Sequence, residues 1–255
     1  MINVFSTAKS GMNAYQEKID YISNDLANLS TTGYKSTDIG FKDLLTEKLD
    51  RKGTPLNDKT AINGTGVRLG INYSNNKQGS LLNTGVQTDL AIDGKGYFAA
   101  YQSDGSIAYT RDGSFKVDAD GVLVDAQGNR VYIDYEEGAA QGEPALVGKD
   151  MTINSKGEIS MKIGEEMVPI GSIKVFTAVG DKSFMPKGNN YFVPADDAEV
   201  TLSDDYDVVQ GFLEGSNVDA SECFTDMILS QRAFQLNSKA LTVADDLWGM
   251  INNMR

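Results

Sequence analysis

Apolar positions at both ends of the chain recur at alternating spacings of three and four residues. In the N-terminal stripe they are Phe5, Ala8, Met12, Tyr15, Ile19, Ile22, Leu26 and Leu29. In the C-terminal stripe they are Cys223, Met227, Ser230, Phe234, Asn237, Leu241, Ala244, Trp248 and Ile251. This spacing keeps side chains on one side of a helix that packs along another helix. We therefore predict helices over residues 3–29 and 220–253 that pair in a coiled-coil-like manner.

The remaining positions of the N-terminal helix are mostly small or amide-bearing. A solvated helix face normally carries more Lys and Glu, whereas small side chains let another backbone approach closely. Gly11 costs about 1 kcal/mol relative to Ala in a helix interior, which favours close packing against it. One apolar seam does not offset the entropy of ordering a whole helix. We therefore expect the termini to be largely disordered in the monomer and to fold on assembly.

Between the predicted helices the pattern changes to short runs typical of strands. Residues 36–85 are rich in Gly, Asn and Thr and are expected to form an extended linker. Farther on, Asp104-Gly105, Asp112-Gly113, Asp120-Gly121 and Gly128-Asn129 are hairpin signals. We predict strands at 90–92, 96–101, 107–110, 114–117, 122–124, 130–133, 151–154, 158–163, 171–178, 191–193 and 208–213.

The predicted fold class is therefore α+β, with an antiparallel all-β domain inserted between two paired terminal helices. The expected boundaries are 1–35 for the N-terminal helix, 36–85 for the linker, 86–215 for the β-domain and 216–255 for the C-terminal helix. The candidate N-caps of the second helix are Asp219 and Ser221.

Charge and composition exclude several classes of function. The net charge is −13, which argues against nucleic acid or an anionic membrane surface as a partner. Most of the negative charge falls between the predicted helices, so that part should be the more exposed one. The sequence has no His, the commonest general base and metal ligand, and only one Cys, which allows no intrachain disulfide. It contains no apolar run suited to a signal peptide or a membrane span, so the protein is expected either to stay in the cytoplasm or to be exported without a cleaved signal.

Three patterns that could carry chemistry fail on spacing. Residues 118–121 lack the register of a calcium loop, and residues 93–96 lack the spacing of a phosphate loop. Five pairs of adjacent acids cannot face one another across a cleft from a single strand, as glycoside hydrolysis requires. We interpret them as solvated surface charge. The pairs are 136–137, 165–166, 196–197, 204–205 and 245–246. We predict no catalytic site, no cofactor, no metal and no small-molecule substrate.

Four ordered motifs resemble those of bacterial flagellar rod and hook proteins. The first is Ala27 to Lys35, which follows the family pattern A-N-x-x-T-x-G-[FY]-K. The second runs from Gly64 to Arg68 and continues at Gln78 to Leu81. The third runs from Asp89 to Phe98 and from Tyr109 to Phe115, and the fourth covers 214–219 and 231–239. The match extends over the whole chain. It departs at Asp25, Ser30 and Cys223, where the family usually has other residues.

The resemblance implies a structural subunit that polymerises with copies of itself into the wall of a helical tube, with the distal rod favoured by Gly64 to Arg68. It also implies contacts with other rod proteins, the hook protein and bushing rings, and export by the flagellar type III apparatus without a cleaved signal. Its location would be the flagellar basal body. The residues expected to carry packing and assembly are Phe5, Met12, Tyr15, Ile19, Ile22, Leu26, Asn28, Thr31, Gly33, Tyr34, Ser216, Asn217, Val218, Met227, Gln231, Arg232, Phe234, Asn237, Leu241 and Trp248.

Two alternatives stay open from the sequence. One is a proximal rod or hook component of the same family. The other belongs to a different class, a β-rich carbohydrate-binding protein or hydrolase with helical arms, which would need convergent acids or aromatic side chains within residues 86–215.

Overall fold

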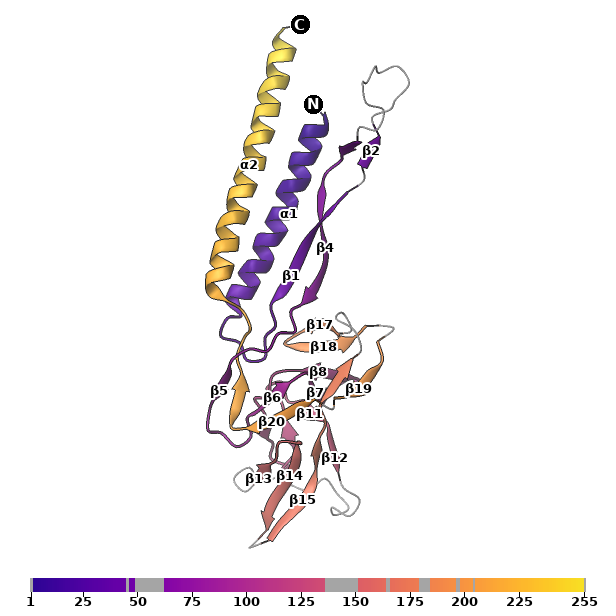
Figure 1. Cartoon of the computed structure of the whole chain (residues 1–255), viewed down its shortest axis with the longest axis vertical. Coiled ribbons are helices and arrows are strands. Elements are labelled where there is room, and N and C mark those ends of the chain that lie inside the picture. Colours follow the sequence, from indigo (N-terminus) through magenta and orange to yellow (C-terminus); the bar gives the residue numbers. More distant parts are fainter. Residues whose placement is uncertain are drawn as a thin grey trace. The chain divides into compact units, whose positions relative to one another are not determined.

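The structure is a computed structural model that describes residues 2–44, 46–48, 62–135, 151–163, 166–178, 184–195, 198–203 and 205–254. Long helices lie at both ends of the chain and strands lie between them (Figure 1). The chain divides into two compact units. The paired-helix unit contains Met1–Ala27, Thr37–Tyr73 and Asp219–Arg255, and the β-unit contains Asn28–Ser36 and Ser74–Val218. The α+β class predicted from the sequence is confirmed.

Two helices dominate the paired-helix unit. Helix α1 covers Ile2–Ala27 and helix α2 covers Ala220–Asn253. They lie side by side and run in opposite directions (Figure 1). Of the two candidate caps, Asp219 is the N-cap of α2, because its carboxylate accepts from the backbone N–H groups of Ser221 and Glu222.

Helix α1 ends before the sequence predicted. Its last residue is Ala27, and the predicted helical end at Leu29 lies in the turn that follows. Gly33 follows the helix with a positive φ of 67°, a conformation common at helix C-caps. It is not the helix cap, however, since its N–H donates to the backbone carbonyl of Glu214 at 2.8 Å.

In the described residues, the paired-helix unit also contains four strands. Strand β1 (Thr37–Asp43) pairs with β4 (Val67–Ser74), and β2 (Thr46–Lys48) pairs with β3 (Ile62–Gly64). The Phe41 ring of β1 lies 5.1 Å from the Tyr15 ring of α1, and Ser10 of α1 accepts from the backbone N–H of Val67. Part of the predicted extended linker is thus paired strand that packs on α1, and another part, residues 49–61, lies outside the described residues.

The β-unit is built from antiparallel strands. Its largest sheet has seven strands in the order β17-β18-β8-β7-β11-β10-β9, and a second has four in the order β12-β15-β14-β13. Three two-stranded pairs, β20-β6, β21-β5 and β16-β19, are added to these. The strands are β5 (Leu81–Asn83), β6 (Leu90–Gly94), β7 (Phe98–Tyr101), β8 (Ile107–Thr110), β9 (Lys116–Val117), β10 (Leu123–Val124), β11 (Arg130–Val131), β12 (Ile133–Tyr135), β13 (Met151–Ile153), β14 (Glu158–Ile163), β15 (Glu166–Ile173), β16 (Phe176–Ala178), β17 (Phe184–Gly188), β18 (Tyr191–Pro194), β19 (Val200–Leu202), β20 (Tyr206–Gln210) and β21 (Phe212–Glu214).

One continuous apolar core holds these sheets together. Its residues fall at alternate positions of several strands, such as Leu90 and Ile92 or Met151 and Ile153, as the period of two requires. The core residues are Leu90, Ile92, Phe98, Phe115, Leu123, Val131, Ile133, Met151, Ile153, Ile159, Ile170, Ile173, Val175 and Val208. A smaller aromatic cluster lies around Tyr97, Tyr109 and Phe192.

Three of the four predicted hairpin turns connect neighbouring strands. They contain Gly105, Gly121 and Gly128, each with φ near 80°, and they join β7 to β8, β9 to β10 and β10 to β11. The fourth is not a hairpin, because β8 and β9 are not neighbours. Glycine is required at position 113 because the Leu90 backbone approaches it closely: a Cβ atom on Gly113 would lie 1.7 Å from the carbonyl oxygen of Leu90.

Candidate assembly surface

Small side chains line the contact between the two helices. On α2, Ser230, Asn237 and Ala244 follow one another at intervals of seven residues, and Ser230 and Ala244 are buried. On α1, Gly11 faces Asn237 so closely that a Cβ atom on Gly11 would lie 3.0 Å from the Asn237 amide oxygen. Small residues at a helix crossing permit this close approach. The close packing expected against Gly11 is thus made within the chain, by the Asn237 side chain.

Polar side chains hold the two helices together near the C-terminal end of α1 and the N-terminal end of α2. Lys18 pairs with Asp226 of α2 at 3.1 Å, and its ammonium group also lies over the Phe41 ring at 5.9 Å. Asp25 is buried and accepts from the backbone N–H of Thr37. These contacts join α1, α2 and β1 into one unit.

Helix α2 carries large apolar side chains that remain exposed in the single chain. Leu236 is 67% exposed, although apolar residues of this size are usually buried in a stable monomer. A helix that is apolar on most of its circumference needs neighbours on several sides. The exposed set is Phe224, Ile228, Leu229, Leu236, Val243, Leu247, Trp248, Met250, Ile251 and Met254, which we call the apolar surface of α2.

The predicted assembly residues on the helices fall into three groups. Ile22 is buried, whereas Phe5, Gln231, Arg232 and Trp248 are exposed. The rest are half-buried, namely Met12, Tyr15, Ile19, Leu26, Met227, Phe234, Asn237 and Leu241. Exposed and half-buried positions are the ones that a neighbouring subunit could still cover, so a role in assembly stays a prediction for them.

The structure brings the predicted residues of the β-unit together. Thr31 donates its hydroxyl to the Asn28 amide oxygen at 3.1 Å, and Asn217 donates its N–H to the Tyr34 carbonyl at 3.3 Å. The Ser216 hydroxyl accepts from the backbone N–H of Val218. Gly33 also belongs to this region through its bond to Glu214.

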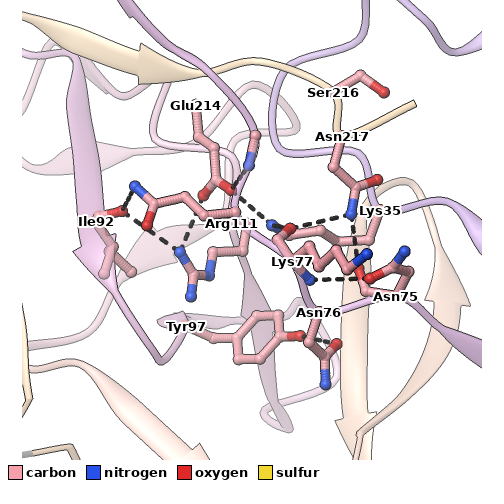
Figure 2. Close-up of polar contacts among 12 residues, drawn as sticks. Lys35, Asn75, Asn76, Lys77, Ile92, Tyr97, Arg111, Glu214, Ser216 and Asn217 are labelled. Atoms are coloured by element: carbon pink, nitrogen blue, oxygen red, sulfur yellow. Dashed lines mark hydrogen bonds and ion pairs between the residues drawn. The ribbon is translucent and has the colours of Figure 1, made fainter. Parts of the chain in front are cut away.

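A buried ionic cluster lies beside these residues (Figure 2). The Glu214 carboxylate is fully buried and accepts from Lys35 Nζ at 2.6 Å and from Arg111 Nη1 at 3.0 Å. Arg111 also donates to the carbonyl of Gly94 at 2.8 Å, and its guanidinium lies over the Tyr97 ring. Burial lowers the pKa of Lys35, and the Glu214 carboxylate partly offsets this.

Sequence reasoning missed this cluster as a three-dimensional site. Lys35, Arg111 and Glu214 each stand inside a different motif of the family resemblance, which was the available signal. What the sequence did not reveal was their convergence, since 179 residues separate Lys35 from Glu214.

A polar hollow of about 1000 Å³ lies in the β-unit. Its acidic lining residues, Asp93, Asp134, Glu158, Asp205 and Asp207, are all exposed to solvent. A general acid for glycoside hydrolysis needs a desolvated setting that keeps it protonated, which exposed carboxylates do not have.

Among the described residues, no three His, Cys, Asp or Glu side chains are grouped so that they could hold a metal ion. Of the predicted acid pairs, only 245–246 is described in full.

The cysteine provides a probe of the paired helices. Burial raises the pKa of the Cys223 thiol, and the carboxylates of Asp25, Glu222, Asp226 and Asp219 raise it further. Because the thiolate is the reactive form, Cys223 in assembled polymer should react with a maleimide more slowly at pH 7–8 than in the denatured chain. Equal rates in the two states would contradict the partial burial of Cys223.

Paired terminal helices, an apolar outer surface on α2 and an inserted β-unit together define a structural subunit built for assembly. Sequence models of three families match the chain: "Flagella basal body rod protein" over residues 5–35, "Flagellar hook protein FlgE/F/G D1 domain" over 91–161, and "Flagellar basal body rod FlgEFG protein C-terminal" over 209–254.

Curated relatives match along the whole chain. The flagellar basal-body rod protein FlgG of Borreliella burgdorferi is 33% identical over 276 residues, covering 100% of this chain and 99% of that protein. FlgG of Agrobacterium fabrum is 34% identical, covering 98% of each chain. The flagellar hook-basal body complex protein FlhP of Bacillus subtilis is 30% identical, covering 100% of each. The chain therefore belongs to the flagellar basal-body rod protein family, and it is a structural subunit of the flagellar basal body. No helix in the described part of the chain has the length and apolar character needed to cross a membrane.

Proposed function

We propose that the chain forms the distal rod, polymerising with copies of itself into a helical tube that transmits torque from the motor to the hook. Its terminal helices would form the tube wall, and its other partners would be rod proteins, the hook protein, bushing rings and the type III export apparatus. In this role the protein performs no catalysis and needs no cofactor, small-molecule substrate or nucleic acid.

The apolar surface of α2 is the observation that carries this proposal. Nine large apolar side chains on α2, and that of its C-cap Met254, remain more than one-third exposed in the single chain. Covering one such side chain contributes about 1.5–3 kcal/mol, so neighbouring copies that enclose α2 gain a large favourable free energy. Within the described part of the paired-helix unit, no other segment covers them.

Electron microscopy of basal bodies from a strain that lacks this protein tests the proposed position. We expect rods that stop short, without a distal section and without a hook. A full-length rod that lacks only the hook would favour the alternative of a hook component, and the absence of the whole rod would favour a proximal rod protein.

The remote alternative, a carbohydrate-binding protein or hydrolase, rests on the polar hollow of the β-unit and its two tyrosines, Tyr135 and Tyr206. Calorimetry with soluble glycan fragments on the full chain separates it from a rod subunit. The rod proposal predicts no binding heat, whereas saturable binding that is lost in a Tyr206→Ala variant would favour the alternative.

A further inference from the structure

Every passage of the chain between the two units runs through one of three segments of the β-unit. Residues 28–36 join α1 to β1, residues 74–80 lead away from β4, and residues 212–218 lead into α2. We call them the connecting segments. Any force that the polypeptide itself carries between the units passes along them.

The ionic cluster joins two connecting segments to the body of the β-unit. Lys35 belongs to the first segment and Glu214 to the third, and their side chains meet at 2.6 Å. Arg111 lies in the loop after β8 and holds the other oxygen of the same carboxylate at 3.0 Å. Arg111 in turn donates to the Gly94 carbonyl of β6, which anchors the cluster to the edge of the core.

The remaining connecting segment is held by the same groups (Figure 2). The backbone N–H of Gly79 donates to Glu214 Oε1 at 2.9 Å, and Lys35 Nζ donates to the Lys77 carbonyl at 2.7 Å. Asn217 donates its side-chain amide to the carbonyls of Asn75 and Lys77 and accepts from the backbone N–H of Ser36. All three connecting segments therefore meet at one place.

The contact is also close at the backbone level. A Cβ atom on Gly79 would lie 2.0 Å from the carbonyl oxygen of Gly215, so these two segments touch where only glycine fits. Two cations share one fully buried carboxylate. Removing the shared carboxylate leaves two buried cations without compensation, which is strongly destabilising.

We infer that Lys35, Arg111 and Glu214 act as a clamp that holds the three connecting segments in fixed positions on the β-unit, before the terminal helices are ordered. The helices then start from fixed points when subunits meet. The link to assembly rests on the proposed function, whereas the order of the segments in the monomer does not depend on it.

Amide hydrogen exchange on the full-length monomer, kept below its polymerisation concentration, tests the clamp. In the wild type, the amides of Gly33, Ser36, Gly79 and Asn217 should exchange at least 100-fold more slowly than amides of an unstructured peptide. Connecting segments that exchange at the unstructured rate would overturn the inference, whether or not the protein forms rods.

Two variants and a control give the test its specificity. Lys35→Met keeps the Glu214–Arg111 pair, so it should speed exchange about 100-fold in residues 28–36 while 212–218 stays protected. Glu214→Gln places a donor NH2 against Arg111 and should release all three segments. Asp134→Asn removes the exposed ion pair with Lys174 and should change none of them. If Lys35→Met leaves residues 28–36 protected, or opens the core strand Phe98–Tyr101 equally, the clamp is wrong; this holds even if Glu214→Gln fails to fold.

Discussion

Replacing Leu236 by glutamate is expected to abolish polymerisation at concentrations where the wild-type protein forms rods, and to leave the β-unit folded. Leu236 is the most exposed leucine of α2. The variant loses about 1.5–3 kcal/mol of apolar burial, and each subunit must also desolvate an unpaired carboxylate, at a cost of several kcal/mol. At about 1.4 kcal/mol per tenfold change, the critical concentration should rise at least 100-fold, which sedimentation of the polymer measures.

Leu202→Glu is the matched control. Leu202 lies on β19 of the β-unit, is 54% exposed and undergoes the same chemical change. It should polymerise at close to the wild-type critical concentration. Normal rods from Leu236→Glu, or loss of rods from both variants alike, would contradict the assignment of the assembly surface to α2.

Replacing Gly11 by leucine is the second change with a large expected effect. A Cβ atom there would already lie 3.0–3.2 Å from three atoms of the Asn237 side chain, and leucine adds three further carbons. Overpacking of this kind costs about 1–3 kcal/mol, against a gain of about 1 kcal/mol from replacing a helical glycine, so the net cost is up to about 2 kcal/mol. At about 1.4 kcal/mol per tenfold change, the critical concentration should rise by up to about 30-fold, and swimming should weaken with it.

A compensating change shows whether this steric contact is the cause. Asn237→Ala removes the atoms that the new leucine would meet, so the double variant should recover polymerisation at least in part. The account of the helix contact is wrong if Gly11→Leu polymerises normally. It is also wrong if the Asn237→Ala change gives the Gly11→Leu variant no recovery at all.

The helices were the most predictable part of the fold. The stripe over residues 220–253 gave both ends of α2, because Asp219 supplies a local cap signal and the apolar spacing continues without interruption. The end of α1 was placed two residues too far along the chain, since Leu29 continues the stripe although the helix has already stopped at Ala27. Periodicity reports which side chains share a face, and it does not report where hydrogen bonding ends.

Strand prediction was sound where runs were bounded by turns that contain Gly, and weaker elsewhere. Ile107–Thr110 and Glu158–Ile163 were predicted with the bounds that the structure gives. Phe184–Gly188 was missed because it contains Pro186 and Gly188, which depress the strand signal. The predicted run 171–178 is two strands, β15 and β16, which belong to different sheets.

The contacts that position functional residues depend on tertiary structure and could not be read from spacing. Local patterns placed Lys35, Arg111 and Glu214 in separate motifs, but only the folded β-unit brings their side chains together. In the same way, composition identified Gly11 as a site of close approach without revealing that Asn237 is the group it meets.

Amide hydrogen exchange of the terminal helices, compared between monomer and rod, tests the central claim most directly. The claim is that the helices gain their stability from neighbouring subunits that cover the apolar surface of α2. It predicts that amides in residues 5–27 and 220–250 exchange nearly as fast as an unstructured peptide in the monomer, and that assembly slows them by several orders of magnitude. Strong protection of both helices in the monomer, unchanged on assembly, would contradict it.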